Sequence, residues 1–139
     1  MTTRFHHVNI CSGNVPALED FYRKLFDLQD ADRGRSQIRT QGYAGDVAFL
    51  TDGHTEMHLA TRDLGVAFRT GQALNPLERG HLAFRTDDLT EIKRRLRELN
   101  IPFADFGAWA MKGWEQIFLY DPEGNIVEVH QVRDSPEAE

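Results

Sequence analysis

The chain has 139 residues, 40% of them hydrophobic and 27% charged, and a formal net charge of −6. This length predicts one domain over residues 1–139, and the composition is that of an ordinary globular protein, which we expect in the cytoplasm. The negative charge argues against nucleic acid or a membrane surface as partner, and a single cysteine, Cys11, excludes an internal disulfide.

The first half of the chain reads as a β-α-β-β-β module over residues 4–62. A short apolar strand begins near His7 and contains Cys11, which we expect to be a buried, inert thiol. Apolar residues then recur at helical spacing, at Val15, Leu18, Tyr22 and Leu25. The segments "DVAFLTD" and "TEMHLAT" alternate around a Gly-His turn, a pattern that predicts a hairpin.

The second half repeats this pattern over residues 79–132. "HLAFRTDDLTEIKRRLREL" matches "HVNICSGNVPALEDFYRKL", with Thr90 as a plausible helix cap and apolar positions at Leu89, Ile92, Leu96 and Leu99. "EQIFLYD" and "NIVEVHQ" flank the turn "PEG" and predict the last hairpin. Residues 63–78 form a turn-rich linker, and residues 133–139 a polar tail that we expect to be mobile.

Ligand-type residues fall on equivalent positions of the two modules. His7 and His81 stand in the first strands, and His58 and Glu128 stand in the last strands. Two modules packed about a pseudo-two-fold axis would bring these four positions together. Three imidazoles and one carboxylate predict a site for one divalent metal ion: Fe, Mn, Ni, Zn or Co.

Two further histidines are expected to lie outside this site. Neighbouring residues of a strand point to opposite faces, so His6 and His7 should not both face the centre. His54 falls in the turn of the first hairpin, where we expect it to face water.

Strand parity and loop composition indicate the surroundings of the metal. Phe118 is equally well explained by core packing, and the tryptophans of the loop "FGAWAMKGWEQ", together with Met111, form either a substrate lid or a dimer interface. The candidate substrate-binding residues are Asn9, Gln116, Phe118, Trp109, Trp114 and His130.

The motifs "HVNI", "GHLAFRTDDL" and "FLYDPEGNIVEV" resemble those of the vicinal oxygen chelate superfamily, over about residues 5–131. This superfamily includes glyoxalase I, extradiol dioxygenases, and fosfomycin- and bleomycin-resistance proteins. The resemblance implies an α+β fold in which two βαβββ modules form a curved eight-stranded mixed sheet. It also implies that His7, His81 and Glu128 are metal ligands, that His58 takes a fourth position which varies in the family, and that the chain forms a homodimer.

The function that these expectations favour is a lyase or isomerase acting on a small substrate that chelates the metal through adjacent oxygens. Glu128 and His58 are its candidate catalytic residues. Glyoxalase I usually has Glu where this chain has His58, a departure that argues against methylglyoxal as the substrate. The alternatives are an Fe(II)-dependent extradiol-type dioxygenase, which uses two histidines and one carboxylate, and a drug-binding protein like the bleomycin-resistance proteins.

Overall fold

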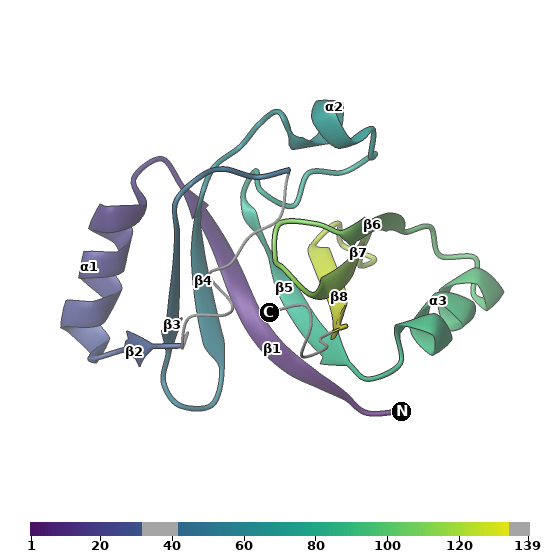
Figure 1. Cartoon of the computed structure of the whole chain (residues 1–139), viewed down its shortest axis with the longest axis horizontal. Helices are drawn as coiled ribbons and strands as arrows, with labels where there is room; N and C mark the ends of the chain where they lie inside the picture. The colour runs from purple at the N-terminus through teal and green to yellow at the C-terminus, as the bar shows by residue number, and fades with distance from the viewer. Residues whose placement is uncertain (32–41, 134–139) are drawn as a thin grey trace.

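The computed structural model describes residues 1–31 and 42–133, so the predicted tail lies outside the described residues except for Arg133. Eight strands form a single mixed sheet in the order β2-β3-β4-β1-β5-β8-β7-β6. The sheet turns from the strands beside helix α1 to those beside helix α3 (Figure 1). The predicted α+β fold with an eight-stranded mixed sheet is confirmed.

The elements follow one another in the same order in the two halves. The first half contains β1 (Thr3–Ser12), α1 (Val15–Phe26), β2 (Gln29–Asp30), β3 (Val47–Thr51) and β4 (Glu56–Thr61). The second half contains β5 (Gly80–Thr86), α3 (Leu89–Glu98), β6 (Ala104–Ala108), β7 (Trp114–Tyr120) and β8 (Ile126–Val132). Between them, the turn-rich linker contains one short helix, α2 (Val66–Thr70).

The two halves meet along their first strands. β1 pairs antiparallel with β5, while β4 lies parallel to β1 and β8 lies parallel to β5. The last strand of each half therefore lies beside the first strand of the same half. As a result, the four strands that carry the predicted metal ligands are neighbours at the centre of the sheet, in the order β4-β1-β5-β8.

Both long helices begin at a side-chain cap in the same place of the repeat. Asn14 Oδ1 accepts a hydrogen bond from the Ala17 amide at 3.1 Å, and Asp88 Oδ1 accepts one from the Glu91 amide at 3.0 Å. The prediction of Thr90 as a cap is wrong, because the carboxylate two residues earlier already satisfies a free amide of the first turn.

The helices cover the two ends of the sheet with separate apolar clusters. Burial of each large aliphatic side chain there contributes about 1.5–3 kcal/mol. The last residue of each predicted apolar stripe does not take part: Leu25 is 60% exposed and Leu99, which lies beyond the end of α3, is 67% exposed. The buried clusters are Val15, Ala48, Leu50 and Leu59 under α1, and Leu89, Leu96, Ile117 and Val129 under α3.

A third cluster lies between the linker and the central strands. It joins Cys11 of β1 to linker residues and to aromatic residues of the second half. Cys11 is buried as expected, and burial raises the pKa of its thiol to about 11, so the thiol stays protonated and inert. The cluster comprises Cys11, Tyr43, Ala60, Val66, Leu74, Leu77, Ala104, Trp109, Ala110 and Phe118.

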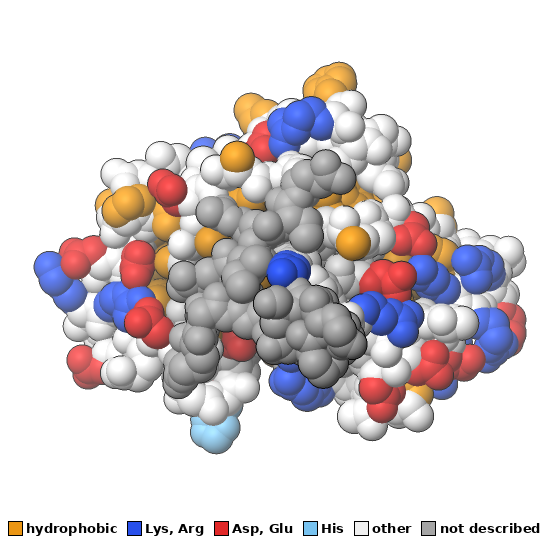
Figure 2. Space-filling model, viewed as in Figure 1, with side chains coloured by type: hydrophobic (Ala, Val, Ile, Leu, Met, Phe, Trp, Pro, Cys, Tyr) orange, Lys and Arg blue, Asp and Glu red, His pale blue; other side chains and the backbone are white. Residues whose placement is uncertain are grey.

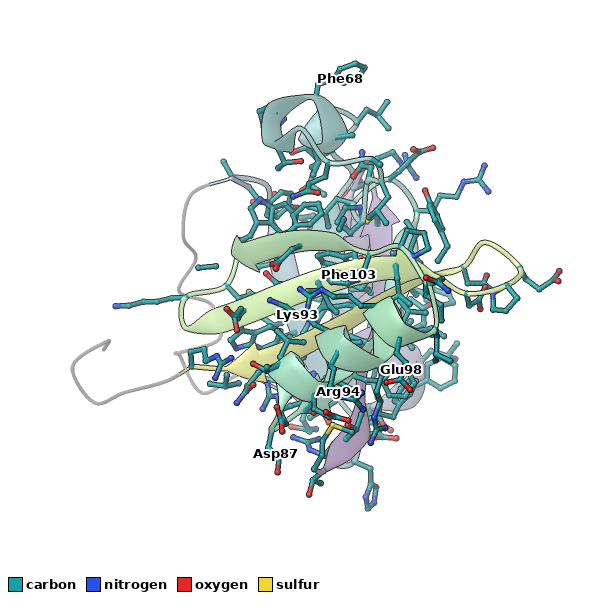
Figure 3. The ribbon with its side chains drawn as sticks, turned by 90° about the vertical axis from the view of Figure 1, so that its right-hand side faces the viewer. Phe68, Asp87, Lys93, Arg94, Glu98 and Phe103 are labelled. Atoms are coloured by element: carbon teal, nitrogen blue, oxygen red, sulfur yellow. The ribbon has the colours of Figure 1, made fainter. Side chains whose placement is uncertain are left out.

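The basic run of α3 lies on the outer face of the helix. Arg94 and Glu98 lie on the exposed side of the helix (Figure 3), where Arg94 forms ion pairs with Glu91 and Glu98, while Lys93 pairs with Asp105 of the edge strand β6. Figure 2 shows acidic side chains among the basic ones at this end of the molecule. The run is therefore the charged face of an amphipathic helix. Among the described residues, no helix is long and apolar enough to cross a membrane.

Gly80, at the start of β5, is required where the two halves meet. Its φ is +139°, and a Cβ atom there would lie 2.1 Å from the Asn9 carbonyl oxygen of β1. We predict that Gly80→Ala lowers the free energy of unfolding by roughly 3 kcal/mol or more, from backbone strain and this clash together. Gly53→Ala is the matched control, because its φ is +99° but nothing lies within 4 Å of the added Cβ. Gly53→Ala should lower the free energy of unfolding by about 1 kcal/mol. Equal losses in urea denaturation would contradict the prediction.

Candidate metal centre

The register of the central strands places the predicted ligands in two adjacent rows on one face of the sheet. In the first row, Asn9 of β1 lies between His58 of β4 and His81 of β5. In the second row, Ala83 lies between His7 and Glu128. Residues two apart on a strand share a face, so the two rows point the same way.

Three of the four predicted ligands converge. His7, His81 and Glu128 each offer one ligand atom, and these atoms all lie within 4.8 Å of one another. Glu128 Oε1 is 3.0 Å from His81 Nε2 and 3.7 Å from His7 Nε2. All three side chains are at least 95% buried.

His58 lies beside this group but is held differently. Its Nε2 is 2.7 Å from Glu56 Oε1, and its ring stacks on that of His7 with the centroids 3.7 Å apart and the planes 18° apart. The lone pair of an imidazole lies in the plane of the ring. Two nearly parallel, stacked rings therefore do not direct their lone pairs at one ion, and in this arrangement His58 is placed as a neighbour of the triad.

The expectation that His6 faces away from the centre is wrong. His6 is 4% exposed and His7 is 1% exposed, and their Nδ1 atoms are 2.7 Å apart. The pairing of β1 with β5 shifts register between Phe5 and His7, so β1 carries a bulge at His6. A bulge breaks the strict alternation of side chains, and two consecutive histidines can then face the same interior.

Hydrogen bonds fix the orientation of two of the three converging ligands. His81 Nδ1 is 2.9 Å from the Pro76 carbonyl oxygen and must donate to it, which leaves Nε2 as the nitrogen that faces Glu128. Arg85 Nε donates to His130 Nε2 at 2.9 Å, so His130 carries its proton on Nδ1 and donates to Glu128 Oε2 at 2.6 Å. Glu128 Oε1 then stays free to face the two imidazoles.

Burial and neighbouring side chains set the charges of the histidines and of Glu128. Burial, and next the neighbouring His58, holds the pKa of His7 well below its usual range. Burial also lowers the pKa of His58 and of His130, although Glu56 and Glu128 oppose it. For Glu128, burial acts to raise the pKa, but His7, His130 and His81 together lower it well below its usual value. At neutral pH His7, His58 and His130 are therefore neutral imidazoles, and Glu128 is a carboxylate anion.

This donor set fits a divalent metal ion. His81 Nδ1 is taken up by the Pro76 carbonyl, so Nε2, 3.0 Å from Glu128 Oε1, is the nitrogen that His81 offers to a cation beside this carboxylate. Two neutral imidazoles and one carboxylate are common ligands of first-row divalent metals. A neutral His7 and an anionic Glu128 are already in the protonation states that metal binding requires.

A cavity of about 50 Å³ opens against the triad. Two buried atoms in its wall lack a hydrogen-bond partner, the only such side-chain nitrogen or oxygen atoms in the described part of the chain: Trp109 Nε1 and Gln116 Oε1. Of the candidate substrate-binding residues, His130 does not line this cavity and instead lies behind Glu128. The others all line it, namely Asn9, Gln116, Phe118, Trp109 and Trp114.

Several residues of the site have no clear signal in the sequence. Glu56 accepts a hydrogen bond from His58. Arg85 donates to His130, which donates to Glu128. The Arg85 guanidinium also lies 5.1 Å from the ring centre of Trp114. Tyr43 enters the cavity wall from the segment before β3. The loop residues Trp109, Met111 and Trp114 are all more than 90% buried in the wall of the cavity.

Comparison with known proteins adds a family and a set of structural neighbours. Residues 4–129 match the model of the Glyoxalase/Bleomycin resistance protein/Dioxygenase superfamily. No curated protein matches the sequence. Among solved structures, a variant of Streptomyces coelicolor methylmalonyl-CoA epimerase with 2-nitronate-propionyl-CoA has a TM-score of 0.67 at 20% identity, over 98% of this chain and 100% of that one.

Two further neighbours support the same fold. Methylmalonyl-CoA epimerase from Mycobacterium tuberculosis has a TM-score of 0.62 at 16% identity, over 96% of this chain and 89% of that one. A hypothetical protein from Bacillus halodurans has a TM-score of 0.65 at 15% identity, over 97% of this chain and 98% of that one.

The buried histidines make stability depend on pH in the metal-free protein. Burial, with Arg85 nearby, lowers the pKa of His6 to about 2, and His7, His58 and His130 are also lowered. In the unfolded chain the pKa of each of these histidines is about 6.5. Below that pH the unfolded state binds more protons, so we predict that the free energy of unfolding falls as the pH decreases from 6.5, and is constant above it.

Guanidinium unfolding of chelator-treated protein between pH 7.5 and 5 measures this effect. Each buried histidine contributes on the order of 1.4 kcal/mol per pH unit to the slope of the free energy of unfolding against pH. His6→Phe should make the slope shallower, whereas His54→Gln, at an exposed turn position, should leave it unchanged. A stability independent of pH across this range would contradict the prediction.

Proposed function

The chain belongs to the Glyoxalase/Bleomycin resistance protein/Dioxygenase superfamily, and from this premise we propose that it is a divalent-metal-dependent isomerase that moves a proton on a small substrate with adjacent oxygens. The observation that carries the proposal is the convergence of His7 Nε2, His81 Nε2 and Glu128 Oε1 at the wall of a cavity. Three protein ligands leave further positions on a divalent ion for substrate oxygens.

A bound metal would act as a Lewis acid and stabilise the negative charge that develops on a carbonyl oxygen when a proton leaves the adjacent carbon. His7, His81 and Glu128 would hold it. The protein must also supply a base, exclude water and orient the substrate. The remaining side chains of the cavity are suited to those three tasks.

His58 is the proposed base. Its Nε2–H donates to Glu56 Oε1, which leaves Nδ1 with the lone pair that accepts the substrate proton. Glu128 lies on β8, across β1 and β5 from His58, so the two catalytic candidates reach the cavity from opposite halves of the sheet. His58 would remove the substrate proton and could return it to the same carbon; inversion of that carbon would need a second acid on the opposite face, the role for which Glu128 is the candidate.

The cavity admits only the reacting end of a substrate. A volume of about 50 Å³ accommodates a few heavy atoms, and most of the wall is apolar, which excludes water. Gln116 Oε1, which lacks a hydrogen-bond partner, is free to accept from a substrate hydroxyl or amide, and the ring of Trp109 forms part of the wall. We assign Asn9, Phe118 and Trp114 to the wall, and His130 to holding Glu128.

The neighbouring structures suggest a first substrate to test. Several are methylmalonyl-CoA epimerases, and one is bound to methylmalonyl-CoA. A methylmalonyl thioester has an acidic carbon between two carbonyl groups, which matches a metal with adjacent free positions and a nearby base. The remainder of such a substrate would lie outside the cavity.

An Fe(II)-dependent extradiol-type dioxygenase is the second candidate. It is favoured by the composition of the triad, because two histidines and one carboxylate with open positions are the ligand set of non-haem Fe(II) oxygenases. A drug-binding protein without catalysis would leave three buried, converging ligand atoms without a role. We also propose that the chain forms a homodimer, which sedimentation velocity measures directly.

We predict that protein purified without chelator contains close to one divalent transition metal ion per chain. Glu128→Gln keeps the shape of the side chain but removes its charge, so it should weaken metal affinity by more than about 100-fold. Glu123→Gln, in the exposed turn before β8, is the control and should bind as the wild type does. Metal content by mass spectrometry and affinity by competition with a chelating dye measure these outcomes.

The identity of the metal separates the candidate reactions. Iron, together with oxygen uptake on addition of a catechol, would favour the dioxygenase. Cobalt, nickel, zinc or manganese without oxygen uptake would favour the isomerase. Absence of a stoichiometric metal from the wild type, even after reloading with each ion, would contradict both proposals.

We predict that the metal-loaded protein exchanges the C2 proton of methylmalonyl-CoA for deuterium in D₂O. His58→Asn should slow this exchange by about 10²–10⁴-fold, the usual contribution of a general base. His54→Asn, at an exposed position, serves as the control. The exchange is followed by proton NMR. Unaltered exchange in His58→Asn would exclude His58 as the base, and no exchange in a wild type that binds metal would exclude this substrate.

A further inference from the structure

Asn9 places an amide in the wall of the cavity, and only one end of this amide has a partner. The side chain lies between His58 of β4 and His81 of β5 in the register of the central strands, and the residue is 8% exposed. Its Oδ1 is 3.3 Å from Cys11 Sγ, whereas its Nδ2 forms no hydrogen bond with any of the residues that the structure describes. An amide N–H held away from bulk water without an acceptor is costly, so this donor needs an explanation.

The thiol of Cys11 fixes which end of the amide is unused. The oxygen and nitrogen ends of an asparagine amide have nearly the same shape, so the hydrogen bond decides between them. The thiol is protonated, because burial raises its pKa to about 11. An oxygen opposite Sγ accepts the thiol proton, whereas an NH₂ group there would leave that proton without an acceptor. The Nδ2 end is therefore the one that remains for the cavity.

The repeat indicates that the fold does not need an amide at this place. Ala83 takes the position of Asn9 in the second half, two residues after the equivalent histidine. It is 0% exposed and lies between His7 and Glu128 in the second row. A methyl group thus satisfies the sheet there, and a thiol is only a weak donor that gains little from an acceptor. A ligand in the cavity explains the amide better than the packing of the strands does.

We propose that Asn9 is an oxyanion donor, whose Nδ2–H donates a hydrogen bond to a substrate oxygen held by the metal, and that Cys11 is the residue that positions it. This inference rests on the proposed function, because the metal would hold that oxygen. The amide is the neighbour of a ligand, His81, and of the proposed base, His58. When a base removes a proton, negative charge develops on the adjacent carbonyl oxygen, and a fixed N–H donor stabilises that charge.

The donor also narrows the class of substrate. Hydrogen bonds to a charged acceptor are roughly twice as strong as those between neutral groups. Asn9 therefore favours an oxygen that is an anion, or becomes one in the reaction, over a neutral hydroxyl. The site is suited to a small carboxylate or enolate with a second oxygen on the adjacent carbon. Oxalate is the simplest stable anion of this class.

Infrared spectroscopy of the metal-free protein tests the orientation of the amide. Cys11 is the only cysteine of the chain, so the S–H stretching band belongs to this residue alone. The wild type should show the band at the lower frequency of a hydrogen-bonded thiol. Asn9→Ala removes the acceptor and should move the band to the frequency of a free thiol. An identical band in the two proteins would overturn the assignment of Nδ2 to the cavity.

The affinity of the Zn²⁺-loaded protein for oxalate, measured by isothermal titration calorimetry, tests the donor itself. Asn9→Ala should weaken oxalate binding about 10–100-fold, as expected for a lost hydrogen bond to a charged group, and leave Zn²⁺ affinity unchanged. Asn125→Ala, in the exposed turn before β8, is the matched control and should bind both as the wild type does. Cys11→Ser keeps a proton donor to Oδ1 and should retain oxalate affinity, whereas Cys11→Ala should lose part of it.

The outcomes separate this proposal from the proposed function. Unchanged oxalate affinity in an Asn9→Ala protein that binds Zn²⁺ would overturn the donor and leave the metal site standing, as would a wild type that binds Zn²⁺ but not oxalate. A wild type without Zn²⁺ affinity would refute the metal site, and the donor with it. Ala83 indicates that Asn9→Ala folds. Should it not, Asn9→Leu keeps the branched shape of the side chain and gives the same test.

Discussion

The buried carboxylate of Glu128 is the constraint on which the rest of the site depends. An anion that is 2% exposed is costly unless hydrogen bonds and opposite charge stabilise it. One oxygen receives a proton from His130, which in turn accepts from Arg85, and the other oxygen faces His7 and His81. One carboxylate oxygen is thus hydrogen-bonded within the protein, and the other lies beside two imidazole nitrogens. A cation would complete this arrangement, whereas a purely structural core would have no reason to bury it.

The duplicated architecture explains how these groups come together. β1 and β5 are equivalent strands that pair antiparallel at the centre, and β4 and β8 flank them in parallel. Equivalent positions of the two halves therefore face each other across one axis, as His7 does with His81. The repeat extends to the helix caps, where Asn14 and Asp88 begin α1 and α3 with the same geometry. Substitution at one such position changes only half of the site, which allows His58 and Glu128 to differ in role while sharing a place in the fold.

The fold and the triad could be predicted from the sequence because each depended on periodic features. Apolar spacing located the strands and helices, and the repeat placed His7, His81 and Glu128 together. Features that break periodicity were missed. A single-residue bulge turns His6 inward, and no composition signal marks it. The orientation of His58 depends on Glu56, two residues away on its own strand, and parity alone cannot distinguish a ligand from a hydrogen-bonded neighbour. The partner of His130 is the buried Arg85, whose role depends on packing over Trp114.

Glu56 lies between the residues of the two proposed tasks of the site, proton removal by His58 and metal binding by His7. One of its oxygens accepts from His58, the proposed base, and the other faces His6, which contacts the ligand His7. With 29% of its side chain exposed, Glu56 is also the member of this network in contact with solvent. A proton taken up by His58 would thus have a neighbouring carboxylate that is in contact with solvent. Because Glu56 lies beside both imidazoles, its charge acts on the proposed base His58 and on His6, the neighbour of the proposed ligand His7.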